Sequence, residues 1–462
     1  MRIPINASSR SASVKVAFIA FLTLTLLIPV GMIKGIVFDR QNNESVAALD
    51  IRNSWGGDQT ITGPVLKLPY KVENKTVYGL PYEDEKIVYL LAKELLVAAD
   101  VVTEERYRGM HKVPVFGAAI TIRGKVDFAA LDTLGITREQ ITWSGAELFL
   151  GVSDPMAIGK IPRVAANGSK VNFSAAAEGI DGLASQLSAQ LGRQLDESQW
   201  QSALELDISL AVNGSGSLRF LPLAENASVT MSSNWASPSF TGRQLPAVRE
   251  VREDGFDASW YSTSMGRKLP AIWIDMHAAQ LRAGEDAFGA RFIQPVGLYQ
   301  VVERATKYAV LIIGLTFIAY FLMEVVGNLK LHPLQYLLVG LANTLFYMLL
   351  LSLSEHVGFD IAYVLSALAS TALVSGYSAA ILVRRSRAAV MAGVLAGLYV
   401  FLYLTLNAEN FALLAGSVGL WVVLAVVMYL TRGINWYATG NGDQKQATGD
   451  GSSTAGAAQA TP

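Results

Sequence analysis

The sequence predicts a membrane protein with two parts: an α-helical bundle of six spans, and a large β-rich α+β extramembrane domain inserted between spans 1 and 2. Two observations predict this class. Charged residues make up 16% of the 462 residues, below the roughly 25% of an average soluble chain. Their scarcity is concentrated in residues 16–38 and in the chain from 308 onward, whereas residues 41–303 have the composition of a water-soluble domain.

Six apolar stretches are long enough to cross a bilayer, because a hydrocarbon core of about 30 Å requires about 20 apolar residues in a helix. They are residues 16–38, 308–326, 334–353, 361–383, 388–406 and 411–430. We interpret the first as a signal-anchor helix that is not removed, because no A-x-A-like cleavage site follows it. The other five are predicted to form a five-helix bundle over residues 308–430.

The connectors between the spans differ in their content of basic residues, and basic loops are retained on the cytoplasmic side of a membrane. The connectors at residues 354–360 and 407–410 contain no Lys or Arg. The other connectors and the termini carry Arg2, Arg10, Lys15, Lys330, Arg384, Arg385, Arg387, Arg432 and Lys445. We therefore predict a cytoplasmic N-terminus (residues 1–15), a disordered cytoplasmic tail (residues 438–462) and a periplasmic strand-rich domain (residues 41–303).

Alternation of apolar and polar residues predicts strands within residues 41–303. The predicted strands cover residues 61–70, 90–102, 113–126, 204–212, 217–221, 258–262 and 271–276. The turn residues Asn213, Gly214 and Gly216 predict a hairpin between the fourth and fifth of these strands. Leucines recur every four residues within residues 180–195, which predicts a helix there. Shorter helical segments are expected near residues 128–134 and 276–283.

The residue inventory argues against several kinds of chemistry. The chain has no cysteine, which excludes disulfides, zinc–thiolate sites and cysteine nucleophiles, and its net charge of −1 gives no reason to expect nucleic acid. Its four histidines lack metal-ligand spacing, and no phosphate-binding loop occurs. Gly416-Ser417 with His356 is a weak match to a membrane serine protease, because small residues are common in packed membrane helices. We predict no catalytic residue, no metal site and no cofactor.

Polar side chains near the ends of the spans are the candidate functional residues, because such side chains are costly in lipid. We interpret most of them as interfacial anchors, and Asn343 as a partner in an interhelical hydrogen bond. Glu355 and His356 belong to one short outer loop, and Glu409 belongs to the other. These three residues are predicted to form a small polar patch that contacts the exported domain or a ligand.

Several long segments of the chain match a known family. They are Ser54-Trp55-Gly56, Asn234-Trp235-Ala236-Ser237-Pro238-Ser239-Phe240, Gly255-Phe256-Asp257-Ala258-Ser259-Trp260, His332-Pro333-Leu334-Gln335-Tyr336-Leu337, Ser354-Glu355-His356-Val357-Gly358-Phe359 and Thr431-Arg432-Gly433-Ile434-Asn435-Trp436-Tyr437. Over about residues 15–437 the chain resembles the CreD family of bacterial inner-membrane proteins, also called cell envelope integrity proteins. The resemblance implies a role in keeping the envelope intact, control by a two-component stress response, and effects on colicin tolerance and beta-lactam response. It implies no catalytic residues.

The leading hypothesis is a non-enzymatic protein of the bacterial inner membrane that supports envelope integrity through a periplasmic binding domain. Its expected partners are the lipid bilayer and an unidentified envelope protein, lipid or glycan. One alternative is a transporter or carrier of lipid or another amphipathic envelope molecule through the bundle. The other is an enzyme that modifies an envelope polymer with the carboxylates Glu83, Asp84 and Glu85.

Overall fold

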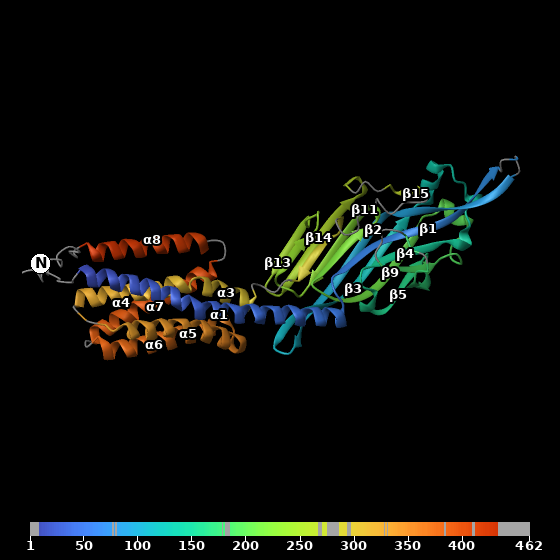
Figure 1. Cartoon of the computed structure of the whole chain (residues 1–462). Helices are drawn as coiled ribbons and strands as arrows, with labels where there is room; N and C mark the ends of the chain where they lie inside the picture. Colours follow the sequence, from blue (N-terminus) through green and yellow to red (C-terminus); the bar gives the residue numbers. More distant parts are fainter. Residues whose placement is uncertain are drawn as a thin grey trace, which may run out of the picture. The chain divides into compact units, whose positions relative to one another are not determined.

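The computed structural model describes residues 9–75, 78, 81–177, 179–180, 185–266, 270–274, 286–292, 297–327, 329, 331–382, 385–408 and 412–432 (Figure 1). The chain divides into two compact units. A helical unit covers Met1–Asn43 and Val296–Pro462, and a strand-rich unit covers Glu44–Pro295.

The first helix is longer than the span predicted at residues 16–38. Helix α1 runs without interruption from Ser9 to Trp55, so its last residues belong to the strand-rich unit. No glycine or proline occurs between residues 39 and 55, and the helix ends before Gly56, which has a φ of 118°. Within the helical unit, α1 buries one stripe of side chains at helical spacing: Leu22, Leu26, Val30, Ile33 and Val37.

Where the structure describes it, the rest of the helical unit contains six helices: α3 (Leu298–Lys307), α4 (Ala309–Gly327), α5 (Pro333–Val357), α6 (Phe359–Ile381), α7 (Arg385–Asn407) and α8 (Ala412–Thr431). The start of α5 is encoded locally. His332 caps the helix, Pro333 occupies its first position, and the His332 backbone amide donates a hydrogen bond to the Gln335 side-chain oxygen at 3.0 Å.

Helix length and hydropathy support most of the predicted spans. Among the described residues, four helices are long and apolar enough to cross a membrane: Val14–Trp55, Pro333–Val357, Phe359–Ile381 and Arg385–Asn407. A fifth span is possible if Leu298–Lys307 and Ala309–Val325, which are bent by 41°, act together. Helix α8 has a shorter apolar stretch, Gly416–Tyr429. The membrane α-helical class is therefore supported with four to five spans, and the count of six stays a prediction.

The helices of this unit pack closely around aromatic side chains and one glycine. Phe317, Phe346 and Tyr399 are among the buried core residues. A methyl group on Gly340 of α5 would lie 2.2 Å from Leu26 of α1 and 2.7 Å from Phe317 of α4. The absence of a side chain at Gly340 therefore allows α1, α4 and α5 to approach one another.

The strand-rich unit contains two sheets that share one long strand. The first, which we call the broad sheet, has the lateral order β13 (Val248–Arg252), β14 (Gly255–Thr263), β11 (Ala224–Ser233), β2 (Pro81–Arg108), β3 (His111–Val126), β9 (Leu204–Ser215), β5 (Ile158–Ala166) and β6 (Ser169–Asn172) (Figure 1). Neighbouring strands are antiparallel except β11 and β2, which are parallel.

The second sheet is built around β1 (Gln59–Lys75). Strand β1 pairs with β2, β4 and β10, and the sheet continues through β4 (Glu147–Val152), β8 (Gln186–Gln190), β7 (Ser174–Ala175), β10 (Ser217–Pro222), β16 (Phe288–Phe292) and β12 (Pro238–Thr241). Strand β2 takes part in both sheets. Up to Leu91 it pairs with β1, and from Ala92 onward it pairs with β11 and then also with β3.

One hydrophobic core joins the two sheets. Alternate residues of the broad sheet, such as Val97 and Ile120, point into this core, which also contains Leu66 and Phe220 of the second sheet. The ring centroids of Trp260 and Phe288, one from each sheet, lie 5.9 Å apart. Because side chains alternate along a strand, the other face of the broad sheet carries the exposed residues over much of its area, while the end of α1 covers it at Val113 and Val115, which are buried against Ile51.

Two secondary-structure predictions for this unit are wrong. Strands β9 and β10 form no hairpin: β9 pairs with β3 and β5, while β10 pairs with β1 and β16. The chain passes from one sheet to the other at Gly216, where φ is 92°. The helix predicted over residues 180–195 is also wrong, because the described part of this segment contains β8. A spacing of four residues is even, so it also places Leu187 and Leu191 on one side of an extended chain.

The other predicted elements of this unit are present where the chain is described. Strands β1, β2, β3, β9, β10 and β14 cover the predicted stretches and extend beyond most of them. The helical segment near residues 128–134 is a 3-10 helix, Phe128–Leu134, capped by the Asp127 carboxylate. Strand β15 (Ile272–Ile274) lies within the last predicted strand. The helix expected near residues 276–283 lies outside the described residues.

Candidate functional site

The predicted polar patch centres on Glu355, near the end of α5. Its carboxylate accepts a hydrogen bond from the Tyr299 hydroxyl of α3 at 3.2 Å and lies 3.5 Å from the Arg40 guanidinium of α1. Its side chain is 10% exposed, compared with 42% for Arg40. Three helices therefore contribute polar atoms to one place, where a largely buried carboxylate is held by a cation and a phenol.

Of the other two residues of the predicted patch, only His356 lies in the described part of the chain. His356 is exposed on the next position of α5, and Glu409 lies outside the described residues. The association of Glu355 with His356 and Glu409 therefore stays a prediction. The sequence did not predict Arg40 and Tyr299 as the partners of Glu355. The one indication in the sequence was that Arg40 is a basic residue close to a predicted span.

A second polar cluster surrounds Glu324, near the end of α4. With 4% of its surface exposed, Glu324 is the most deeply buried acidic or basic side chain among the residues described. Its carboxylate forms an ion pair with Lys15 of α1. It also accepts hydrogen bonds from the Tyr336 hydroxyl of α5 at 2.9 Å and from the Leu331 amide at 3.2 Å. The cluster joins α1, α4 and α5 through a single carboxylate.

Polar side chains also lie deep among α5, α6 and α7. The Tyr399 hydroxyl is 3.5 Å from the Asn343 amide oxygen, which matches the interhelical contact expected for Asn343. The Tyr363 hydroxyl donates to the Tyr399 carbonyl at 2.7 Å. The Asn343 amide nitrogen and the Tyr347 hydroxyl are buried without a hydrogen-bond partner among the described residues. These groups add polarity to the core of an otherwise apolar bundle.

The strand-rich unit presents a different kind of surface on the outer face of the broad sheet. Its strand register places one row of small side chains side by side across five strands: Ser259, Thr230, Ala98, Thr121 and Ser209. All five are exposed or half-buried. Because these side chains are short, a partner can approach the sheet backbone closely along this row. We call the exposed side of this sheet the outer face.

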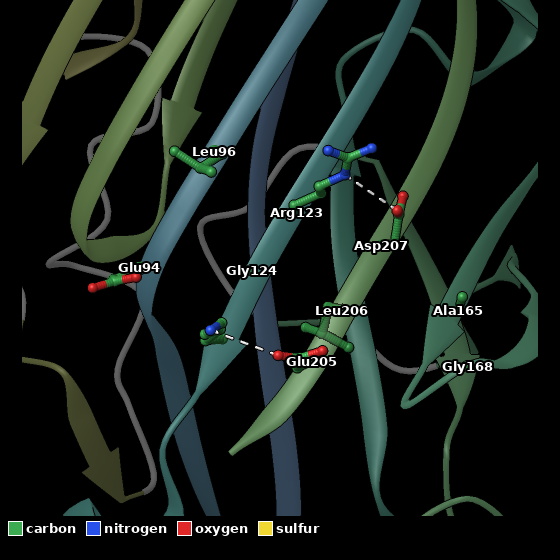
Figure 2. Close-up of a pocket in the computed structure, with 10 residues that line it drawn as sticks. Glu94, Leu96, Arg123, Gly124, Ala165, Gly168, Glu205, Leu206 and Asp207 are labelled. Carbon is green, nitrogen blue, oxygen red and sulfur yellow. Dashed lines mark hydrogen bonds and ion pairs between the residues drawn. The ribbon is translucent and has the colours of Figure 1, made fainter.

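Five shallow cavities open on the outer face. One has a volume of about 450 Å³ and lies over β2, β3, β9 and β5 (Figure 2). In Figure 2 the Arg123 and Asp207 side chains point toward one another across β3 and β9, with 3.3 Å between the guanidinium Nε and the carboxylate. Another cavity, of about 520 Å³, includes Lys160 and Ser209. The cavities follow one another across the sheet, and none of these five is a deep enclosed site.

Charges on the outer face are unevenly distributed. On the edge strand β13, Arg252 is flanked by Asp257 and Glu250. Its hydrogen bond to Asp257, and to a smaller extent its hydrogen bond to Glu250, raise the pKa of Arg252 above its ordinary value. On the other side of the sheet, Lys160 and Arg163 are exposed and take part in no ion pair in the part of the chain that the structure describes. The face is therefore acidic at one end and basic at the other.

The carboxylates considered for catalysis from the sequence lie on β2, where it pairs with β1. Glu83 of β2 is exposed and forms an ion pair with Lys71 of β1 at 2.8 Å; this contact raises the pKa of Lys71. Asp84 is 3.4 Å from the Asn74 amide nitrogen. The Ser417 hydroxyl donates to the Leu414 carbonyl of its own helix at 2.9 Å. Among the described residues, no group of three or more His, Asp or Glu side chains is placed to hold a metal ion.

The apolar helices and the polar clusters within them define a multi-pass integral membrane protein with a large strand-rich unit. The comparisons specify the family. The sequence profile of the family described as "Inner membrane protein CreD" matches residues 11–437. The chain is 33% identical, over 429 residues, to the inner membrane protein CreD of Escherichia coli strain K12, and the match covers 90% of this chain and 91% of that protein. The chain belongs to the CreD family and is a multi-pass protein of the bacterial inner membrane.

Proposed function

We propose that this protein supports the integrity of the cell envelope by binding a partner on the periplasmic side, through the outer face of the broad sheet, without catalysing a reaction. The outer face carries the proposal. It extends over eight strands, contains a row of small side chains, and bears five shallow cavities. A broad, shallow surface suits a macromolecular partner better than a small substrate, which is usually bound in a deeper cleft.

The location of this unit is the first part of the test. The chain has no cysteine, so a single introduced cysteine reports on one position without background. Ser144→Cys lies in the strand-rich unit away from the outer face, and Ser386→Cys lies in a connector predicted to be cytoplasmic. With intact spheroplasts and a membrane-impermeant maleimide, we expect Ser144→Cys to be labelled and Ser386→Cys to be labelled only after lysis. The reverse pattern would refute the periplasmic assignment.

Binding by the outer face is the second part of the test. Ala98→Cys places a thiol in the row of small residues, and a maleimide photo-cross-linker attached there should capture a specific component in whole cells. Ser144→Cys with the same reagent provides the matched control, because it lies in the same unit away from the outer face. Adducts that are the same for both variants, or absent from both, would contradict the proposal.

A further inference from the structure

The middle of the helical unit contains buried polar groups that the described residues do not satisfy. The Asn343 amide nitrogen and the Tyr347 hydroxyl of α5, and the Ser366 hydroxyl of α6, have no hydrogen-bond partner in the described part of the chain. All three residues are 0% exposed. Each lies within about 6 Å of the midpoint of its helix, measured along the axis, so these groups are at the depth where a bilayer is driest.

Two of these groups, together with a tyrosine of α7, form one side of a polar cluster. Asn343 and Tyr347 are four residues apart on α5, so their side chains lie on the same face of that helix. The Tyr399 hydroxyl of α7 is 3.5 Å from the Asn343 amide oxygen. Tyr347 is close enough to Tyr399 for the two side chains to interact electrostatically. Polar atoms of α5 and α7 therefore meet in one place.

Helix α6 completes the cluster. Ser366 lies between Tyr363 and Ser370 on one face of α6, about one turn from each. The Tyr363 hydroxyl donates to the Tyr399 carbonyl at 2.7 Å, and the side chains of Ser370 and Tyr399 are hydrogen-bonded. Ser366 is therefore flanked by two residues that both contact Tyr399. We call the following six residues the central cluster: Asn343, Tyr347, Tyr363, Ser366, Ser370 and Tyr399.

We propose that the central cluster is a binding site for water molecules. The groups without a partner determine the chemistry of the ligand: the Asn343 amide nitrogen donates hydrogen bonds, and the hydroxyls of Tyr347 and Ser366 both donate and accept them. None of the six side chains is charged, which favours a neutral ligand over an ion. The six residues are at most 3% exposed, so the ligand must be small. Water is the smallest neutral molecule that both donates and accepts hydrogen bonds.

The free-energy cost of unpaired polar groups favours water at this site. A buried donor or acceptor without a hydrogen bond costs more than the immobilisation of one water molecule, and a single water serves about two to four partners. The apolar neighbours offer no alternative. Phe346, whose ring centroid is 4.5 Å from that of Tyr399, and Leu350 are both fully buried beside the cluster and carry no hydrogen-bonding side-chain atom.

Polar side chains connect the central cluster to the Asp360 end of the bundle. The ring centroids of Tyr363 and Tyr403 are 5.1 Å apart, and the Tyr403 hydroxyl donates to the exposed Asp360 carboxylate at 2.9 Å. In the opposite direction along α6, the first buried residue after Ser370 is the apolar Val374, which is 1% exposed. Water therefore enters the site from the Asp360 end and stops before Val374.

Hydrogen exchange of single thiols tests the hydration of the cluster. The chain has no cysteine, so Ser366→Cys introduces one S–H group, whose infrared stretching band can be followed in heavy water. Val374→Cys is the matched control, because position 374 is buried in the apolar core about two turns further along the same helix. In the full chain in lipid nanodiscs, we expect exchange about tenfold faster at position 366, because exchange requires contact with water. Equal rates, in variants that melt at the wild-type temperature, would overturn the proposal.

A third thiol tests the direction from which water enters. Ser370→Cys lies between the other two positions on α6, so we expect its exchange rate to be close to that of Ser366→Cys and well above that of Val374→Cys. The sharp fall in rate should come between positions 370 and 374. Faster exchange for Val374→Cys than for Ser366→Cys would place the entry at the opposite end of the bundle and overturn the path through Tyr403.

Hydroxyl-radical labelling of the unmodified protein provides a test that needs no substitution. Radicals formed from water by an X-ray pulse oxidise neighbouring side chains, so a buried aromatic ring is oxidised rapidly where water is bound beside it. Tyr347 and Phe317 of α4 are both 0% exposed, and Phe317 lies outside the central cluster. We expect mass spectrometry to show several-fold faster oxidation of Tyr347. Equally slow oxidation of both rings would show a dry cluster. Neither result bears on the outer face of the broad sheet, so this inference and the proposed function fail independently.

Discussion

Glu324 and Glu355 show how individual carboxylates are accommodated among apolar helices. Both lie near helix ends, and each accepts a hydrogen bond from a tyrosine and faces a cation on α1. Sequence reasoning could identify both as polar residues near spans, because charged residues are rare in such segments. It could not identify their partners, because Arg40 and Lys15 are more than 300 residues away along the chain and are brought close only by helix packing.

Replacement of Glu324 by leucine should destabilise the helical unit. The change would leave the Tyr336 hydroxyl and the Leu331 amide without their acceptor, at a cost of about 1–3 kcal/mol in the free energy of unfolding. Thermal unfolding of the full chain in detergent measures the effect. Glu303→Leu is the matched control, because Glu303 forms only an exposed pair with Lys307 four residues on, worth about 0.5 kcal/mol or less. Equal losses for the two variants would contradict a structural role for the Glu324 cluster.

At the scale of elements, the sequence predicts best where burial alternates without interruption. Strands β3 and β9 are long and have one face in the core, so their period of two is clear in the residues. The helix predicted around Leu187 was wrong because leucines spaced four residues apart are compatible with either a helix or a strand. The hairpin predicted at Gly216 was wrong because turn residues do not specify whether the next strand pairs with the previous one or enters another sheet.

The contact at Gly340 yields a prediction for helix packing. Gly340→Ala should lower the stability of the full chain by about 1–3 kcal/mol, because the new methyl group would overlap Leu26 and Phe317. Gly376→Ala is the matched control, since nothing lies within 4 Å of a methyl group at that position. Leu26→Ala combined with Gly340→Ala should recover part of the loss. Equal melting temperatures for the Gly340 and Gly376 variants would show that α1 does not pack against α5 in this way.

At the scale of the whole molecule, composition and charge predict the division into an apolar helical unit and a polar strand-rich unit. The distribution of basic residues among short connectors also predicts an orientation in the membrane. The candidate binding face could not be predicted, because it depends on side chains from strands distant in sequence. Ser209 and Ser259, for example, belong to the same row only through the register of three strands between them.

The orientation of the C-terminus tests whether α8 completes an even number of spans. With six spans both ends of the chain lie in the cytoplasm, so green fluorescent protein fused after Pro462 should fluoresce and alkaline phosphatase fused there should be inactive. Ser144→Cys labelling on the same fusions serves as the reference for the strand-rich unit. An active phosphatase at the C-terminus, together with outside labelling of Ser144→Cys, would show that the number of spans is odd.

The long strand β2 has a mechanical consequence for the strand-rich unit. Residues on either side of the Leu91–Ala92 bond are hydrogen-bonded into different sheets, so covalent backbone connects the two layers directly. A load applied to one layer would reach the other along this peptide chain, without sliding of packed side chains. Tension on the outer face would therefore be shared by both layers, and the unit would resist being pulled apart more strongly than two sheets held together by their core alone.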